Sequence, residues 1–262
     1  MSGNEPPAPT EAVGIVHLYP TLMGTYGDGG NVKVLVRRLA ARGLAARVVT
    51  VNPADAVPEQ ADLYVLGGGE DASQVAAARE LRTSGALGRA AGRGAAIFAV
   101  CAGLQLLGED FEVSGGQLEP GLGLVDARTR RQEPRAVGEV LAQGVDPAVA
   151  GLPLLTGYEN HGGGTQLGPA ARPLARVVAG VGNGGGAEGD GWEGLAQGSV
   201  IATYLHGPVL ARNPALADRL LELAVGAPLA PFEAPFVADL RAEREAYTRA
   251  GRLSAESART PR

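Results

Sequence analysis

The stretch AAIFAVCAGLQLLG, residues 95–108, decides the fold of this chain. Residues 95–100 form an apolar run of the kind that is buried on both faces of a parallel sheet, and the residues after Cys101 favour a helix. Cys101 therefore stands at a sharp turn from strand to helix, and the small residues Ala99 and Gly103 permit that turn. The pattern predicts a thiol that points outward at the carboxyl edge of a sheet.

The residues before this stretch alternate between short apolar runs and helical spacing. Apolar residues at helical spacing predict a helix that includes Val32 to Leu39 and ends at Gly43, and a second helix covers about 73–83. Strands that alternate with helices form βαβ units, so the sequence predicts an α/β fold with a doubly wound, mostly parallel sheet flanked by helices. The expected strands before residue 95 are 13–19, 45–51 and 61–66.

Beyond residue 110 the pattern predicts glycine-broken strands and an antiparallel extension of the sheet. The glycine-rich run 180–194 is expected to be a mobile hairpin loop. Asn213 and Pro214 predict the start of a helix, and Gly226 predicts its end. The strand candidates lie around 136–142, 154–158, 176–179 and 199–205.

The chain divides into three parts by composition. Residues 1–12 are rich in proline and polar groups and are expected to be a disordered lead. Residues 13–227 are expected to form one domain. Residues 228–262 begin with a proline-broken linker and continue as an amphipathic tail, which over about 236–249 is either a last helix packed on the domain or a docking element.

Composition limits the classes of function. A hydrophobic content of 45% over 262 residues suits a globular core, and a net charge of −5 without a basic block gives no footprint for nucleic acid or anionic membrane. No signal-peptide pattern and no long apolar run occurs, so we expect a cytoplasmic protein without membrane insertion. The single cysteine excludes an intramolecular disulfide and a multi-cysteine zinc site.

Cys101 is the candidate nucleophile. The amides of the helical turn that follows it favour a thiolate, and the N–H of Ala102 is available to an oxyanion. Gly67, Gly68 and Gly69 end the preceding strand, so their amides are expected at the same edge of the sheet. The alternatives are that the cysteine is a small buried hydrophobe and that the glycines form only a turn.

His206 ends the apolar run 199–205 and is followed by Gly207 and Pro208. A histidine at that edge can meet a cysteine distant in sequence, and such pairing activates the thiol. The alternative is a structural histidine. His161 lies in the stretch GYENHGG, which is expected to be a polar loop, and the alternative to a functional role for His161 and Glu159 is loop hydrogen bonding.

Five motifs carry a resemblance to a known family. The chain resembles class I glutamine amidotransferases of the cobyric-acid-synthase-like branch, which have a flavodoxin-like fold, and within it the glutaminase subunits that serve Mur-ligase-like synthetases. The resemblance covers residues 15 to about 226 in order. The motifs are LYPTLMGTYGDGGNV near the start, LGGGED at 66–71, VCAGLQLLG at 100–108, GYENHGG at 157–163 and YLHGP at 204–208.

The resemblance implies roles for individual residues. Cys101 is the nucleophile and His206 the general base and then acid. Backbone amides near Gly68 or Gly69 and at Ala102 form the oxyanion hole. Arg135 holds the carboxylate of L-glutamine, as suits a guanidinium fork, although Arg128, Arg130 and Arg131 remain alternatives. Gln105 helps to hold the substrate, and Asn160 and His161 flank the pocket.

The chain departs from many family members after the histidine. They carry a glutamate two residues later that orients the imidazole, whereas Pro208 occupies that position here. The resemblance implies that an acidic residue of a partner completes the triad. The chain alone is therefore expected to be a weak glutaminase and to be stronger in complex.

The resemblance also implies the partner and its chemistry. The chain has no phosphate-binding GxxxxGK[ST] motif and no lysine after Lys33, so no cofactor is expected in it. ATP and any metal are expected in a MurT-like Mur ligase subunit that amidates the D-glutamate of the lipid II stem peptide, with this chain as its heterodimer partner. The alternatives are a glutaminase subunit for a corrinoid amidase, a stand-alone cysteine hydrolase of γ-glutamyl compounds, and a non-catalytic module that senses glutamine.

Overall fold

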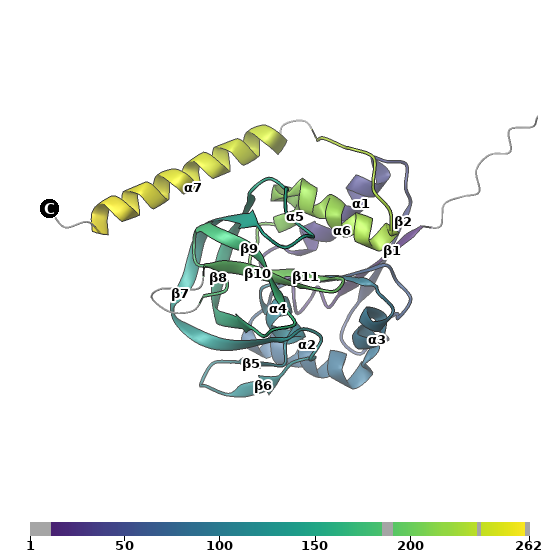
Figure 1. Cartoon of the computed structure of the whole chain (residues 1–262). Helices are drawn as coiled ribbons and strands as arrows, with labels where there is room; N and C mark the ends of the chain where they lie inside the picture. The colour runs from purple at the N-terminus through teal and green to yellow at the C-terminus, as the bar shows by residue number, and fades with distance from the viewer. Residues whose placement is uncertain (1–11, 185–190, 235–236, 260–262) are drawn as a thin grey trace, which may run out of the picture.

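An eleven-stranded sheet forms the centre of the protein (Figure 1). The computed structural model describes residues 12–184, 191–234 and 237–259, with 252–259 described by their backbone alone. The strand order is β2-β1-β3-β4-β11-β10-β9-β7-β5-β6, and β8 pairs with β7. Of the expected disordered lead, residues 1–12, all but Ala12 lie outside the described residues.

One half of the sheet is parallel, as the sequence predicts. Its inner strands are buried on both faces because helices cover both, so they read as continuous apolar runs, whereas the edge strand, residues 46–51, is mostly exposed or half-buried. They are β2 (Ala46–Val51), β1 (Val13–Leu18), β3 (Leu63–Leu66), β4 (Ala96–Val100) and β11 (Val200–Thr203), in their order across the sheet.

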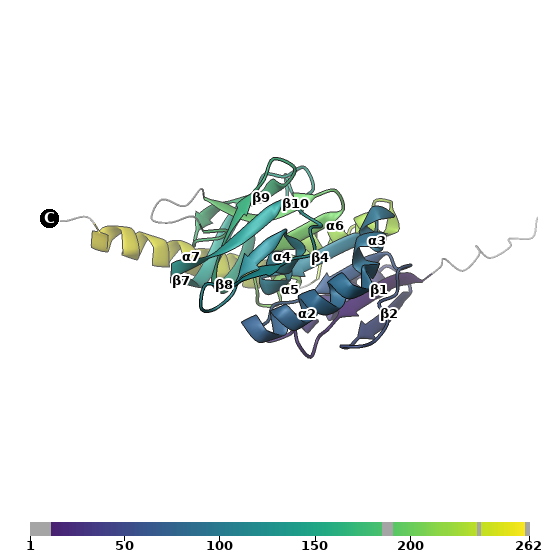
Figure 2. The ribbon, with the colours of Figure 1, turned by 90° about the horizontal axis from the view of Figure 1, so that it is seen from below.

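Two groups of helices cover the parallel half. In Figure 1 one group lies above the strands and the other below, and Figure 2 shows the second group in front of them. The α/β fold class with helices on both faces is confirmed. The first group is α1 (Gly29–Ala40), α5 (Val209–Arg212) and α6 (Pro214–Val225), and the second is α2 (Asp71–Ser84), α3 (Ala86–Gly92) and α4 (Ala102–Leu107).

The other half of the sheet is mainly antiparallel, so the predicted extension is confirmed. β10 (Trp192–Gln197) pairs antiparallel with both β11 and β9 (Arg172–Ala179). β7 (Ala127–Gly144) then pairs antiparallel with β9 and with β8 (Leu155–Leu167). The short strands β5 (Asp110–Glu112) and β6 (Leu118–Pro120) close this side.

Two loop predictions are wrong. Residues 157–163 belong to β8, where alternate side chains point inward, so that Glu159 and His161 are each only 2% exposed. Glycine and polar residues hid this alternation, because strand predictions look for apolar residues. Trp192 likewise begins β10 inside the stretch expected to be a mobile loop, and the centre of that stretch, 185–190, lies outside the described residues.

The helix after His206 is confirmed in its limits. Pro214 starts α6, and Gly226 ends it in a left-handed conformation. The side chain of Asn213 does not cap the helix as expected. It accepts a hydrogen bond from the amide of Thr156 at 2.9 Å and donates to its carbonyl at 2.7 Å, and thereby ties α6 to β8.

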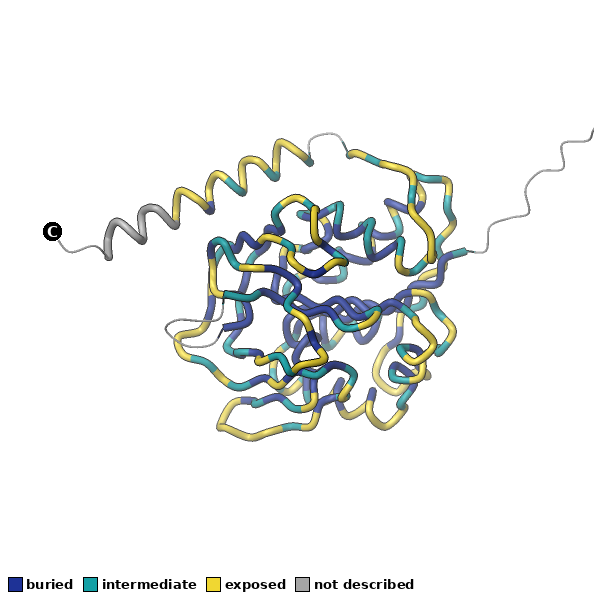
Figure 3. Tube along the Cα trace, viewed as in Figure 1, coloured by how far each residue is buried: buried dark blue, intermediate teal, exposed yellow. Residues whose placement is uncertain are grey.

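The tail forms α7 (Val237–Arg259), which extends past the edge of the sheet (Figure 1). Arg241 anchors the helix by donating to the carbonyls of Arg212 and Leu154, and Thr248 is buried. The opposite face is exposed, as the burial colours of Figure 3 show, with Leu240 60% exposed. None of the described helices is long and apolar enough to cross a membrane.

Candidate active site

The register of three parallel strands brings the candidate residues to one edge. Leu66 of β3 pairs with Ala99 of β4, and Val100 of β4 pairs with Thr203 of β11. The chain segments that follow these strands therefore lie side by side. The amide of Cys101 donates to the carbonyl of Thr203 at 2.8 Å, which joins the two segments that carry Cys101 and His206.

Cys101 occupies the predicted turn between β4 and α4. Its backbone has φ 54° and ψ −111°, a conformation that is strained for a residue with a side chain. Gly103 makes the turn possible, because a Cβ there would lie 2.8 Å from the carbonyl oxygen of Gly67. Cys101 is 6% exposed and lines a cavity, so its thiol is accessible rather than sealed in the core.

Backbone hydrogen bonds fix His206 against β8. Its amide donates to the carbonyl of Tyr158 at 2.8 Å, and the amide of Tyr158 donates back at 3.2 Å. The side chain is 2% exposed. Its Nδ1 lies 3.1 Å and 3.2 Å from the two carboxylate oxygens of Asp28, so Nδ1 carries a proton that it donates to Asp28.

Asp28 supplies the carboxylate that the sequence seemed to lack. It belongs to the loop between β1 and α1, is 1% exposed and accepts a hydrogen bond from the amide of Gly68 at 2.8 Å. The expectation that a partner's acidic residue must orient the histidine therefore needs correction, because this chain fills the Nδ1 position itself. The available signal was the acid within the glycine-rich stretch TYGDGG.

The second imidazole nitrogen is the one that Asp28 leaves free. Burial disfavours the charged imidazole, but hydrogen bonding to Asp28 and interaction with Cys101 outweigh it and raise the pKa of His206 to about 10. Nε2 is buried and has no hydrogen-bond partner among the described residues. A Cβ on Gly68 would lie 2.9 Å from Cε1 of His206 and 3.2 Å from Cβ of Cys101, which shows how tightly the three residues pack.

A narrow cavity of about 50 Å³ opens beside the thiol. The predicted residues Gly69, Ala102, Gln105, Arg135, Asn160 and His161 all line it. Arg131, one of the alternatives to Arg135 in the sequence, also lines it, together with polar residues that the sequence did not single out for the site: Tyr26, Glu70, Asp71, Gln74 and Glu112.

Two of the four candidate arginines reach this cavity. Arg135 donates from Nε to Oδ1 of Asn160 at 2.7 Å and from Nη2 to its carbonyl at 2.9 Å, which leaves Nη1. A Cβ on Gly162 would lie 3.8 Å from that Nη1 and 3.7 Å from Nη2 of Arg131, so the two guanidiniums converge there. Arg130 instead pairs with Asp110, and Arg128 pairs with Glu109 and Asp110.

A buried polar network supports the wall behind Cys101. Gln105 accepts a hydrogen bond from Gln74 at 2.9 Å and donates to the hydroxyl of Tyr204 at 3.2 Å, so its amide is engaged within the protein. His161 stacks on the Tyr204 ring at 3.8 Å between centroids, and its Nδ1 lies 2.8 Å from the carbonyl oxygen of Gly163. Both side chains therefore shape the pocket from inside the sheet.

One of the backbone amides predicted to form the oxyanion hole is occupied within the protein. The amide of Gly68 donates to Asp28, so it does not point at a substrate. The amides of Gly69 and Ala102 remain, and both residues line the cavity.

Glu193 is a buried carboxyl that no sequence pattern singles out. It lies on β10, is fully buried, and accepts hydrogen bonds from the hydroxyl of Thr203 and from the amide of Tyr204. Burial is the main cause that raises the pKa of Glu193 to about 7. The carboxyl braces the end of β11 just before His206.

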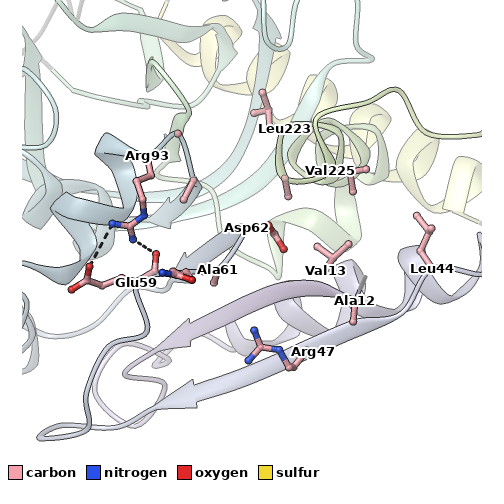
Figure 4. Close-up of a pocket in the computed structure, with 14 residues that line it drawn as sticks. Ala12, Val13, Leu44, Arg47, Glu59, Ala61, Asp62, Arg93, Leu223 and Val225 are labelled. Carbon is pink, nitrogen blue, oxygen red and sulfur yellow. Dashed lines mark hydrogen bonds and ion pairs between the residues drawn. The ribbon is translucent and has the colours of Figure 1, made fainter. Parts of the chain in front are cut away.

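A larger cavity of about 550 Å³ lies at the opposite edge, at the amino ends of the parallel strands (Figure 4). Arg93 forms an ion pair with Glu59 there, and Asp62 accepts a hydrogen bond from the amide of Gly14. Its charged groups are thus partly paired, and Cys101 and His206 are not among its lining residues. In the described part of the chain, no group of three or more metal-binding side chains occurs.

Solved structures share this fold. A crystal structure of a glutamine amidotransferase aligns over 80% of this chain and 98% of its own, with a TM-score of 0.55 and 23% identity. The PurLQS structure from Thermotoga maritima aligns over 83% of this chain and 99% of the matched chain, with a TM-score of 0.56 and 16% identity. The fold is that of the class I glutamine amidotransferases.

The chain belongs to the CobB/CobQ-like glutamine amidotransferase domain family, whose model matches residues 14–214. It is 31% identical over 243 residues to the GatD subunit of lipid II isoglutaminyl synthase (glutamine-hydrolyzing) from Staphylococcus aureus, covering 91% of this chain and 96% of that protein. GatD from Streptococcus pneumoniae is 34% identical, covering 80% of each chain. A cobyric acid synthase from Pelotomaculum thermopropionicum is 42% identical over 132 residues, which is 25% of that protein.

Proposed function

We propose that the chain hydrolyses L-glutamine to glutamate and supplies the ammonia to a Mur-ligase-like synthetase that amidates the D-glutamate of lipid II. The observation that carries the proposal is the packing of Cys101 and His206 against Gly68, with Asp28 hydrogen-bonded to Nδ1 of the imidazole. Similarity to GatD over almost the whole length of both chains supports the choice of synthetase.

The first half of the reaction forms a thioester. Because the pKa of His206 is raised to about 10, the imidazole already holds the thiol proton as an imidazolium paired with the thiolate, and Sγ of Cys101 attacks the Cδ carbonyl carbon of glutamine. We assign the amides of Gly69 and Ala102 to the oxyanion of the tetrahedral intermediate. The intermediate collapses as His206 returns a proton to the nitrogen, which breaks the C–N bond and releases ammonia.

The second half restores the enzyme. His206 removes a proton from water, which attacks the γ-glutamyl thioester, and the protonated imidazole then returns that proton to the departing sulfur. Glutamate leaves with its new carboxylate. Asp28 acts through the histidine: it keeps the proton on Nδ1, so that Nε2 is the nitrogen left free for proton transfer.

Arg131 and Arg135 are suited to hold the α-carboxylate of glutamine. Their free nitrogens converge beside Gly162 at the wall of the pocket, and two guanidiniums provide a bidentate grip on a carboxylate. The carboxylates of Glu70 and Glu112 line the same pocket and suit the α-ammonium group. The pocket thus offers both charges that a free amino acid requires.

The synthetase partner supplies the remaining chemistry. This chain has no P-loop motif, so we assign ATP binding and any metal to a MurT-like Mur ligase subunit. Activation of the D-glutamate carboxyl would take place there, and ammonia from Cys101 chemistry would complete the amide.

The decisive experiment is reconstitution. The chain is co-expressed with a Mur-ligase-like protein encoded beside it, and the purified complex is tested for amidation of lipid II with ATP and glutamine. The Cys101→Ala complex should lose amidation with glutamine and keep it with ammonium chloride, because external ammonia bypasses the thiol. Loss with both nitrogen sources would assign Cys101 a structural role, and retention with glutamine would overturn the nucleophile assignment.

The same experiment separates the alternatives. A glutaminase for a corrinoid amidase would hydrolyse glutamine but fail to amidate lipid II. A stand-alone hydrolase would cleave γ-glutamyl compounds and bind no synthetase. A glutamine sensor would bind glutamine without turnover, and its binding would survive Cys101→Ala.

A further inference from the structure

Tyr26 contacts the imidazole of His206 and also Asn160, the residue that holds Arg135. It belongs to the loop between β1 and α1, in the same short stretch as Asp28. Its ring covers the His206 ring, with centroids 4.7 Å apart and planes inclined by 54°. Its hydroxyl accepts a hydrogen bond from Nδ2 of Asn160 at 3.2 Å and lies 3.5 Å from a carboxylate oxygen of Glu70.

Asn160 extends this connection to the substrate grip. Its side-chain oxygen accepts from Nε of Arg135, and its carbonyl accepts from Nη2. A continuous series of contacts therefore runs from the guanidinium of Arg135 through Asn160 to Tyr26 and ends on the imidazole of His206.

The loop that carries Tyr26 also carries the carboxylate that orients the histidine. The amide of Thr25 donates to the carbonyl of Gly68 at 3.3 Å, and Asp28 binds the amide of the same glycine. A shift of Tyr26 would therefore disturb Asp28 as well. Because Thr25 and Asp28, on either side of Tyr26, are both held at Gly68, the position of Tyr26 depends on how closely the loop lies over the pocket.

We propose that Tyr26 is a positioning residue that closes the pocket over His206 and couples the binding of glutamine at Arg135 to the placement of the imidazole. This inference rests on the proposed function of the site. Burial of the phenol and the nearby Glu70 raise the pKa of Tyr26, so its hydroxyl stays protonated and acts as a hydrogen-bonding group, not as a base. Its ring keeps water from one face of the imidazole.

Two substitutions separate the roles of the ring and the hydroxyl. Tyr26→Phe keeps the ring over His206 and removes the link to Asn160, so we expect KM for glutamine to rise about fivefold with kcat within about twofold. Tyr26→Ala uncovers the imidazole and loosens the loop, so we expect kcat to fall about tenfold or more. Tyr247, 66% exposed on α7, provides the control: Tyr247→Phe and Tyr247→Ala should leave both constants unchanged.

A second measurement needs no turnover. The rate at which iodoacetamide alkylates Cys101 is recorded against pH, because this rate reports the ionisation of the thiol and imidazole. We expect Tyr26→Ala to shift the pH profile and Tyr26→Phe to keep it. Thermal unfolding of each variant, within a few degrees of the unmodified chain, shows that the fold is retained.

These measurements distinguish failure of the role proposed for Tyr26 from failure of the proposed function of the chain. If the unmodified chain, alone and in complex, hydrolyses no glutamine, the proposed function fails, while the alkylation profile still reports whether Tyr26 acts on His206. Unchanged KM and kcat in Tyr26→Phe would overturn the role of the hydroxyl. An unshifted profile in a folded Tyr26→Ala chain would overturn the role of the ring.

Discussion

The carboxylate of Asp28 lies 3.1 Å from Nδ1 of His206, although 178 residues separate them in the sequence. The contact fixes which imidazole nitrogen is free, and Nε2 has no hydrogen-bond partner among the described residues. A thiol, an imidazole and a carboxylate from one chain are thus arranged in the order that nucleophilic catalysis requires.

Asp28→Asn tests this arrangement. The amide keeps the size of the carboxylate but offers Nδ1 either a donor or a weaker acceptor, so the imidazole loses its fixed tautomer. We expect kcat for glutamine hydrolysis to fall about 100-fold or more with little change in KM. Asp239→Asn, on the exposed side of α7, is the matched control and should be unchanged.

The pH dependence of the same variant provides a second readout. Asp28 helps to raise the pKa of His206, so Asp28→Asn should move that pKa down toward its ordinary value. The measurement is the pH profile of Cys101 alkylation, or the chemical shift of the imidazole by NMR. An unchanged profile would mean that Asp28 does not act on the histidine.

Because Asp28 is present, we expect measurable glutaminase activity from the chain alone. The earlier reason to expect a weak enzyme was the absence of an orienting carboxylate, and that reason no longer holds. Steady-state hydrolysis by the isolated chain and by its complex gives the comparison. A rate in complex that exceeds the isolated rate many-fold would show that the partner contributes something other than this carboxylate.

The two pocket arginines should act on substrate binding. Arg131→Ala or Arg135→Ala removes one guanidinium from the point where both converge, so KM for glutamine should rise about tenfold in each case. Arg128→Ala and Arg130→Ala remove guanidiniums that pair with acidic residues elsewhere, and should leave KM unchanged. Equal effects in all four variants would contradict a specific carboxylate site.

Gly68 tests how tightly the site is packed. A methyl group there would press on the imidazole and on Cβ of Cys101, so Gly68→Ala should lower kcat about tenfold or more while the fold remains. Gly92→Ala is the control, since a Cβ at Gly92 has no neighbour within 4 Å. Activity of Gly68→Ala equal to that of the unmodified chain would contradict the close packing.

Glu193 should make stability depend on pH. Its pKa is about 7 in the folded chain and near 4.5 when unfolded, so between these values the folded state holds the extra proton. This contribution stabilises the fold at low pH and is lost as pH rises from about 4.5 through 7. In Glu193→Gln the decline should disappear, as measured by urea unfolding from pH 5 to pH 8, with Glu243→Gln on the exposed tail as control.

The sequence predicted the inner strands of the parallel half of the sheet well because both faces of these strands are buried. Continuous apolar runs followed by helical spacing are strong local signals, and the residues around Cys101 carry all of them within one segment. The turn at Cys101 followed from the same segment. The sequence did not predict β10 or the full length of β7 and β8, because their inward residues include Glu159, His161 and Glu193, which do not resemble core residues.

The role of Asp28 was not predicted for a different reason. Its role depends on a long-range contact, and no local pattern reveals which acid among 28 will meet a given histidine. The same holds for the arginines: Arg128, Arg130, Arg131 and Arg135 are close in sequence, but strand alternation and the irregularity in β7 between Arg131 and Ala136 decide which of them face the pocket.

The position of β11 between the parallel and antiparallel parts of the sheet makes the two parts interdependent. The sulfur is presented by the first part, whereas both guanidiniums and Asn160 come from the second. A shortened polypeptide that ended before β7 would keep the sulfur but lose His206 as well as the groups that hold an amino acid. The group that reacts and the groups that select the substrate thus come from separate sequence segments. They act together only when the two parts of the sheet are joined at β11.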